Sequence, residues 1–314
     1  MEPRAESFPT DRLPGEVDLD VDLDIDVEAL RALARSLACE AGEQVRAGRP
    51  ERVEVAATKS NDVDPVTDMD RAVEAQLRRR IAAERPNDAI LGEEGDDVAG
   101  TSGLTWVLDP IDGTVNYLYG VASYAVSVAV VAGPVDPERW TALAGCVHSV
   151  VDGHTWTAAR GGGAERDGRP LRVNRPESLA RSLLGTGFGY APERRARQGE
   201  VLAHVLPRVR DIRRLGSAAI DLCLLAEGGL DLYYERGLNP WDLAAGALVA
   251  AEAGAWVGGL RGRGPGSAMT VAGATPVVTE LVRLLEDADA DGAEAPAKAR
   301  RADEVRAFRD RVRG

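Results

Sequence analysis

The stretch 104-LTWVLDPIDGTVNYLYG-120 constrains the fold more than any other part of the chain. Its apolar start is typical of a buried strand, which stops at Asp109 and is followed by a second carboxylate at Asp112. Pro110 fixes its own φ and biases Asp109 towards an extended conformation. A sharp turn here can aim both carboxylates at one point, and Ile111 between them offers its backbone carbonyl. The chain must therefore fold so that a core strand ends in an acidic loop.

The residues after the second carboxylate suit a phosphate group. Gly113 permits a tight turn or the close approach of a ligand. If a helix starts here, the free backbone N–H groups of Gly113 and Thr114 form an anion site. One loop would then combine hard oxygen ligands with phosphate donors, as magnesium–phosphate sites do. The alternative is a simple turn in which an aspartate caps a helix, and the motif alone leaves both open.

Three other segments carry acidic residues that could join this loop. Glu93 and Glu94 follow an apolar run and are either candidate ligands or part of a solvated loop. Asp242 lies in the first turn of a strongly apolar helix, where it either lines an interior cleft or complements the helix dipole. Thr67 and Asp70 have the spacing of a capping box, which alone could explain Asp70.

Composition sets limits on the class of protein. The chain has 314 residues, 44% of them hydrophobic and 28% charged, which is ordinary for a globular protein with a substantial core. A net charge of −13 argues against binding nucleic acid or an anionic membrane. No apolar run is long enough to span a bilayer, and we expect no secretory signal. Three scattered cysteines predict reduced core thiols in a cytoplasmic protein: Cys39, Cys146 and Cys223.

The two ends of the chain differ from its middle. Residues 1–26 hold nine carboxylates and two arginines. Over residues 17–26, aspartates alternate with apolar residues, which could indicate a half-buried strand. Because the like charges would oppose strand pairing, we predict an acidic, disordered tail instead. Residues 287–314 form a second charged tail, with a short exposed helix from about residue 302.

Between the tails, helical and strand patterns come in mixed order, without an internal repeat. This order predicts a layered α/β or α+β architecture rather than a (β/α)₈ barrel. The patterns predict helices over 27–45, 67–84, 193–206, 217–227, 241–253 and 276–286; strands over 89–92, 104–108, 124–132, 142–150, 154–159, 182–186, 231–234 and 269–272; and a turn over 161–173 that leads into another strand.

Together these segments resemble the inositol monophosphatase family, within the lithium-sensitive, magnesium-dependent phosphatase superfamily. The resemblance covers roughly residues 27–286 and implies a layered α/β/α/β/α sandwich, the sugar phosphatase fold. The site is expected between two sheet-containing halves, and the chain is expected to pass from the first half to the second near residues 150–180. It rests on GEE (92–94), DPIDGTVNY (109–117), NPWDLAAG (239–246) and EAG (252–254), supported by K…DPVTDMDR (59–71), GTGFGY (185–190), RRLGSAAIDLC (213–223) and DLYYERG (231–237). Two positions depart from the family pattern, Ala122 and Ala255, and neither is a proposed ligand.

The resemblance also implies roles for individual residues. Two to three Mg²⁺ ions are expected, with Asp109 bridging two of them and a third, weaker ion near Glu93. The implied metal ligands are Glu93, Asp109, the carbonyl of Ile111, Asp112 and Asp242. The implied catalytic residues are Thr114 and Asp70, which position the attacking water, and Glu93. The implied substrate contacts are Asp112, Gly113, Thr114, Gly216, Ser217, Ala218, Glu235 and Asp242, with Lys59 as a basic residue near the site.

The expected activity is that of a Mg²⁺-dependent phosphomonoesterase acting on a small polyol or sugar phosphate. Inositol 1-phosphate is the favoured substrate, and metal-activated water is the nucleophile. Histidinol phosphate, 3′-phosphoadenosine nucleotides and fructose bisphosphate are the alternatives. A cytoplasmic, lithium-sensitive homodimer is expected by analogy. A non-catalytic relative that binds a partner, such as the transcription machinery, is disfavoured because every implied ligand is present.

Overall fold

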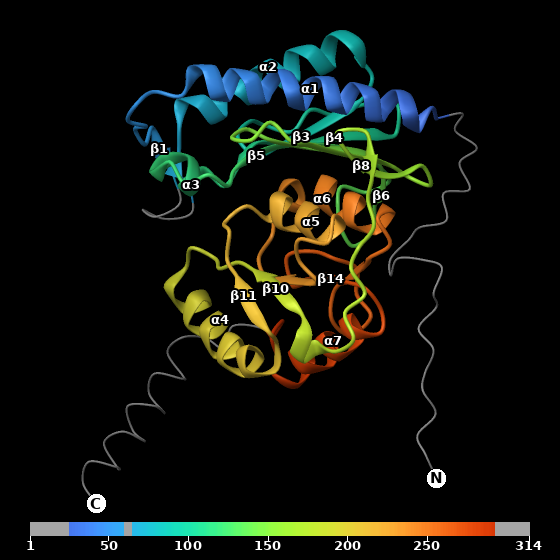
Figure 1. Cartoon of the computed structure of the whole chain (residues 1–314). Helices are drawn as coiled ribbons and strands as arrows, with labels where there is room; N and C mark the ends of the chain where they lie inside the picture. The colour runs from blue at the N-terminus through green and yellow to red at the C-terminus, as the bar shows by residue number, and fades with distance from the viewer. Residues whose placement is uncertain (1–24, 60–64, 293–314) are drawn as a thin grey trace, which may run out of the picture.

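The computed structural model describes residues 25–59 and 65–292, which form five layers (Figure 1). Helices α1 (Val27–Gly48) and α2 (Asp68–Glu84) lie over the larger sheet. Two helices separate this sheet from a smaller one, whose outer face carries two more helices. The layered α/β/α/β/α sandwich is therefore confirmed. The acidic tail predicted over 1–26 and the C-terminal tail with its helix lie outside the described residues, except at their inner ends.

The larger sheet has seven strands in the order β3-β4-β5-β6-β7-β8-β9. Strands β3 and β4 are parallel, and every other neighbouring pair is antiparallel. The parallel pair matters for the site, since the carboxyl ends of both strands meet at one edge. The strands are β3 (Ala89–Gly92), β4 (Leu104–Asp112), β5 (Ala125–Ala132), β6 (Thr141–Ser149), β7 (Thr155–Ala159), β8 (Gly163–Arg166) and β9 (Arg169–Pro170).

The central layer consists of α5 (Ala218–Ala226) and α6 (Pro240–Glu252). Both are apolar around most of their circumference because sheets cover them on two sides. Small residues allow the layers to approach closely. A Cβ atom on Gly145 of β6 would lie 3.0 Å from the Cα atom of Ala245 in α6. This close packing fixes where α6 begins relative to the end of β4.

The smaller sheet has five strands in the order β11-β10-β12-β14-β13. Strand β10 is parallel to both of its neighbours, and the remaining pairs are antiparallel. Helices α4 and α7 pack on its outer side (Figure 1). The bounds are β10 (Leu183–Thr186), α4 (Pro192–Val205), β11 (Asp211–Arg213), β12 (Leu232–Glu235), β13 (Trp256–Gly258), β14 (Thr270–Gly273) and α7 (Val277–Asp287), with short 3₁₀ turns at Leu179–Arg181 and Leu206–Arg208.

The sequence patterns missed the shortest elements. Strands β11 and β13 have three residues each, and β1 (Ala57–Thr58) and β2 (Pro65–Val66) have two. Such lengths are too short to show a hydrophobic period. The turn-rich segment 161–173 contains the hairpin of β8 and β9, and the chain then crosses to the second sheet before β10.

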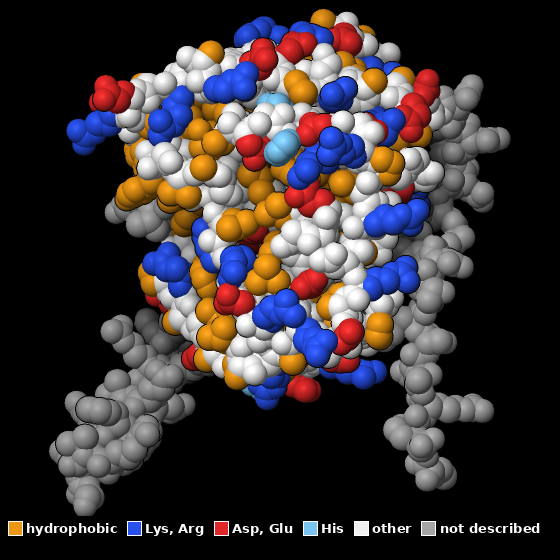
Figure 2. Space-filling view, in the orientation of Figure 1, with side chains coloured by type: hydrophobic (Ala, Val, Ile, Leu, Met, Phe, Trp, Pro, Cys, Tyr) orange, Lys and Arg blue, Asp and Glu red, His pale blue; other side chains and the backbone are white. Residues whose placement is uncertain are grey.

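The surface is charged with both signs. Figure 2 shows acidic and basic side chains interspersed over the face in view, with hydrophobic side chains gathered near α3 (Thr114–Tyr119) in the upper left. Two exposed apolar residues of that region are Tyr119 and Val121. Among the described residues, no helix is long and apolar enough to cross a membrane. The three cysteines are free; Cys146 and Cys223 are buried, and Cys39 is half-buried.

Candidate active site

A β-bulge at the end of β4 places Asp109 and Asp112 on one side of the strand. Asp109 pairs with Ser127 of β5 and Asp112 pairs with Ala125, so two residues of β4 stand opposite one residue of β5. In a regular strand, residues three apart point to opposite faces. The extra residue of a bulge reverses this alternation and re-aims the second side chain. The two carboxylates can therefore share one site.

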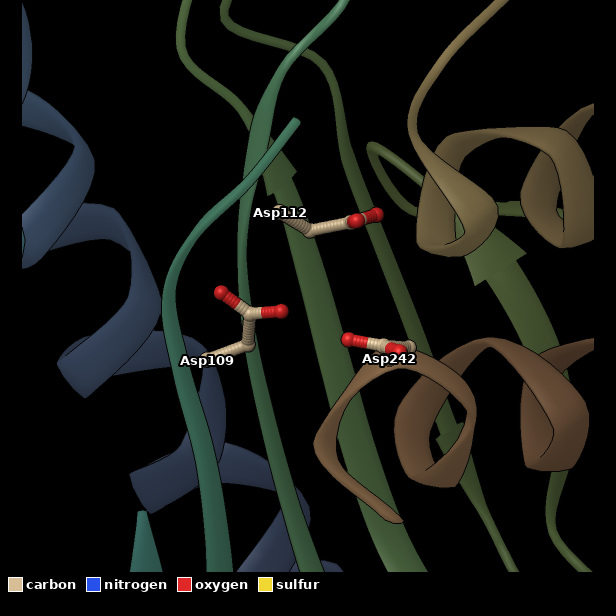
Figure 3. A group of neighbouring side chains, drawn as sticks. All are labelled: Asp109, Asp112 and Asp242. Atoms are coloured by element: carbon tan, nitrogen blue, oxygen red, sulfur yellow. The ribbon is translucent and has the colours of Figure 1, made fainter. Parts of the chain in front are cut away.

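Asp242 joins the pair from the central layer. It is the third residue of α6, and its Oδ2 accepts a hydrogen bond of 2.7 Å from the backbone N–H of Asn239. Asp242 is thus a helix-capping acid and also part of the cleft, so both interpretations of this residue hold. One carboxylate oxygen each from Asp109, Asp112 and Asp242 lies within 4.8 Å of the others. Figure 3 shows the three side chains pointing into the space between β4 and α6.

Glu93 reaches the same edge because β3 runs parallel to β4. Gly92, the last residue of β3, pairs with Leu108, so Glu93 follows beside Asp109. Its carboxylate binds Lys59 Nζ at 2.7 Å, and the same ammonium binds Glu94 at 2.6 Å. Glu93 and Lys59 both line the cavity described below. A metal that uses Glu93 would therefore compete with this ion pair.

Burial raises the pKa of each member of the acidic group, and mutual repulsion adds to this for Asp109 and Asp242. Burial, followed by the charges of Glu93, Asp112 and Asp242, raises the pKa of Asp109 well above its usual range. Burial raises the pKa of Glu93 to about 7 and that of Asp112 to about 6. Burial and the neighbouring charge of Glu93 likewise raise the pKa of Asp242.

These shifts indicate what the group can hold. Buried carboxylates that repel one another are stable as anions only with a compensating cation. The donors are hard oxygens at the mouth of a cavity, which is the donor set that Mg²⁺ prefers. The residues present therefore fit a divalent cation, one of the two interpretations that the sequence motif left open.

Thr114 and Asp70 form a buried pair next to the carboxylates. Gly113 has φ +96°, and a Cβ atom there would lie 2.9 Å from the carbonyl oxygen of Ser123, so the turn into α3 requires glycine. The Thr114 hydroxyl lies 3.0 Å from the carbonyl oxygen of Ile111 and 3.3 Å from Asp70 Oδ1.

Asp70 is fixed from its other side by a capping box. The backbone N–H of Thr67 donates to Asp70 Oδ2 at 2.8 Å, and the Thr67 hydroxyl contacts the same oxygen. Burial raises the pKa of Asp70, and the hydrogen bonds from Thr67 limit that rise. The capping interpretation of Asp70 is confirmed, and its second oxygen still faces Thr114.

A cavity of about 500 Å³ extends from the acidic group towards the smaller sheet. Gly216 and Ala218 line it, whereas the Ser217 hydroxyl between them donates to Asp112 Oδ2 at 2.6 Å. Glu235, at the end of β12, lines the far side and accepts a 2.6 Å hydrogen bond from the Tyr233 hydroxyl. Burial raises the pKa of Glu235 to about 7.

Four charged residues of the cavity wall were not predicted from the sequence: Arg194, Arg214, Asp221 and Arg236. Arg214 and Asp221 lie within the segment RRLGSAAIDLC, and Arg236 lies within DLYYERG; both segments support the family resemblance. Arg214 precedes the start of α5 and Asp221 follows it. One arginine and one aspartate at such positions do not indicate a binding site. Only the packing of α5 against the smaller sheet brings them to the cavity.

Comparison with known proteins agrees with this architecture. A model of the inositol monophosphatase family matches residues 26–301. An inositol-1-monophosphatase SuhB from Mycobacterium tuberculosis is 46% identical over 276 residues, which cover 82% of this chain and 93% of that protein. The solved structure of Mycobacterium tuberculosis SuhB superposes with a TM-score of 0.71 at 45% identity, covering 84% of this chain and 98% of that one. A Nus factor SuhB from Vibrio cholerae is 34% identical over 72% of this chain and 83% of that protein.

The sandwich fold, the converging carboxylates and the adjoining cavity are those of a phosphatase family that is in general metal-dependent. This chain belongs to the inositol monophosphatase family. Its substrate is accordingly a phosphorylated compound.

Proposed function

We propose that the protein hydrolyses a polyol phosphomonoester with Mg²⁺, and that inositol 1-phosphate, giving myo-inositol and phosphate, is its substrate. The observation that carries this proposal is the convergence of Asp109, Asp112 and Asp242 within 4.8 Å at one end of a cavity with Glu235 on its wall. The acidic end suits cation-bound phosphate, and the far wall suits hydroxyl groups. Relatives that carry the name inositol-1-monophosphatase support the choice of substrate.

The proposed metal ligands are the carboxylates of the acidic group and one backbone oxygen. Glu93, Asp109, Asp112, Asp242 and the carbonyl of Ile111 would hold two to three Mg²⁺ ions. When bound, such ions lower the pKa of water and stabilise the charge on the leaving oxygen. The carboxylates then need no proton to relieve their repulsion. Lithium inhibition is part of this proposal.

The chain's own residues would orient the nucleophile. The single hydrogen of the Thr114 hydroxyl can go to the Ile111 carbonyl or to Asp70 Oδ1. When that carbonyl binds a cation, Asp70 is left to accept this hydrogen, and the Thr114 oxygen can then accept a hydrogen bond from water. The backbone N–H groups of Gly113 and Thr114 would hold the phosphate. Water then forms a new bond to phosphorus as the ester oxygen departs and takes up a proton. Phosphoryl transfer depends mainly on such positioning and charge stabilisation.

The experiment is a substrate screen of the purified full chain with and without Mg²⁺. The panel contains inositol 1-phosphate, histidinol phosphate, fructose 1,6-bisphosphate and 3′-phosphoadenosine 5′-phosphate. We expect the highest kcat/KM for inositol 1-phosphate, and no turnover after chelation. Preference for another member of the panel would replace the substrate, and Mg²⁺-independent turnover or no turnover of any phosphomonoester would end the proposal.

Two further properties belong to the proposal. We expect a homodimer in the cytoplasm, which sedimentation and cell fractionation would test. The relationship to a protein named Nus factor SuhB makes binding to the transcription machinery a second candidate role, alongside catalysis. Pull-down with the full chain and with a chain lacking residues 1–26 tests that role; capture of none of its components by either chain would remove it.

A further inference from the structure

Asp221 is a buried carboxylate that the mechanism above does not use. It lies on α5, is 1% exposed, and borders the cavity. Its Oδ1 has no hydrogen-bond partner among the described residues. A buried acceptor without a partner is costly, and a specific unsatisfied group of this kind calls for an explanation.

Two hydroxyl groups of this region already donate to other acids. The Tyr233 hydroxyl donates to Glu235, and the Ser217 hydroxyl donates to Asp112. Burial, together with the charges of Glu235 and Asp112, raises the pKa of Asp221 well above its usual range, so both acids lie near enough to act on it. No group among the described residues donates to Oδ1, so a ligand in the cavity can supply its partner.

We propose that Asp221 is a specificity-determining residue that reads a substrate hydroxyl next to the one that Glu235 contacts. This inference rests on the proposed polyol phosphatase activity. Two carboxylates on one wall match a ligand that presents hydroxyl hydrogens on neighbouring carbons, at the end of the molecule away from the phosphate.

The charge of the wall favours a hydroxyl over an ammonium group. Arg214 lines the same cavity, and its charge acts on Asp221, Glu235 and Asp112. A hydroxyl can donate to a carboxylate and accept from a guanidinium at the same time, whereas an ammonium group can only donate. The wall thus selects a neutral polyol rather than an amino alcohol phosphate.

The test compares Asp221→Ala and Asp221→Asn with a matched control, Asp231→Asn. Asp231 precedes the same strand that Glu235 ends; its carboxylate accepts from the backbone N–H of Leu183 at 2.7 Å, and it does not line the cavity. Each variant is assayed with inositol 1-phosphate, with histidinol phosphate, and with p-nitrophenyl phosphate, which has no hydroxyl group.

For Asp221→Ala we expect the KM for inositol 1-phosphate to rise about tenfold, as the loss of one hydrogen bond to a buried carboxyl group implies. The shape-preserving Asp221→Asn variant should show a smaller rise, and Asp231→Asn none. With p-nitrophenyl phosphate, kcat and KM should stay within about twofold in all variants, since the missing contact is absent from that substrate.

Several results would overturn the inference. If the Asp221→Ala variant loses the same factor in kcat/KM for inositol 1-phosphate and for p-nitrophenyl phosphate, Asp221 is a structural residue. A fall in kcat/KM confined to histidinol phosphate would show that Asp221 binds an ammonium group. If Asp221→Ala does not fold, an unchanged KM in Asp221→Asn refutes the role. If the wild-type enzyme does not hydrolyse inositol 1-phosphate with Mg²⁺, the proposed function itself fails, which distinguishes the two failures.

Discussion

The burial of the acidic group predicts that the metal-free protein loses stability as the pH rises. The perturbation is a change from about pH 5 to about pH 8 in the presence of a chelator. Burial raises the pKa of Glu93 from 4.5 to about 7 and that of Asp112 from 3.8 to about 6. A group with a raised pKa in the folded state contributes stability below its unfolded pKa. That contribution is lost as the pH rises through the folded pKa, here between about pH 4.5 and 7.

The magnitude follows from the size of the shifts. For Glu93 alone, a shift of this size corresponds to on the order of 3 kcal/mol of unfolding free energy. Asp109 and Asp242 are shifted in the same direction. Because the groups interact, their contributions do not add independently. His148 opposes the trend, since burial lowers its pKa and its contribution grows with pH.

Urea unfolding at both pH values, with chelator and with Mg²⁺, measures the effect. We expect lower stability at the higher pH with chelator, and recovery on adding Mg²⁺, which binds the folded state. The Glu93→Gln variant isolates the effect from His148, because it should flatten the pH dependence of the metal-free protein. Stability that is constant or rising with pH in chelator, with the same slope in Glu93→Gln, would refute the electrostatic account.

Three substitutions test the rest of the site. Asp242→Asn should retain the fold, as checked by circular dichroism, and lose at least about a hundredfold in Mg²⁺-dependent kcat; near-normal kinetics would make Asp242 only a helix-capping acid. Gly113→Ala should cost about 1–3 kcal/mol in urea unfolding, since it strains a positive φ and crowds the carbonyl of Ser123; an unchanged midpoint would contradict the strain. Thr114→Ala should lower kcat about a hundredfold while Thr114→Ser retains most of it, because only the hydroxyl is needed to link Asp70 to water; equal losses in both would remove that role.

The helices and long strands of this protein follow from local sequence. The patterns over 27–45 and 104–108 predicted α1 and β4, since apolar spacing reports which face of an element is buried. Fold class followed from the order of these elements and from motifs that resemble a known family. The very short strands were not predicted, because two or three residues are too few to show a hydrophobic period.

The sequence by itself determined which residue types are available to the site, because acidic and glycine-rich motifs at strand and helix ends are visible in the chain. Only the tertiary structure decided how they are used. A bulge that depends on pairing with β5 turns Asp109 and Asp112 to one side, and the packing of α6 between two sheets brings Asp242 to them across more than a hundred residues. Packing of α5 likewise leaves Asp221 Oδ1, at the cavity wall, without a hydrogen-bond partner among the described residues. These outcomes arise from contacts between distant segments, and a local sequence pattern cannot encode the distance between two elements that meet only in the folded protein.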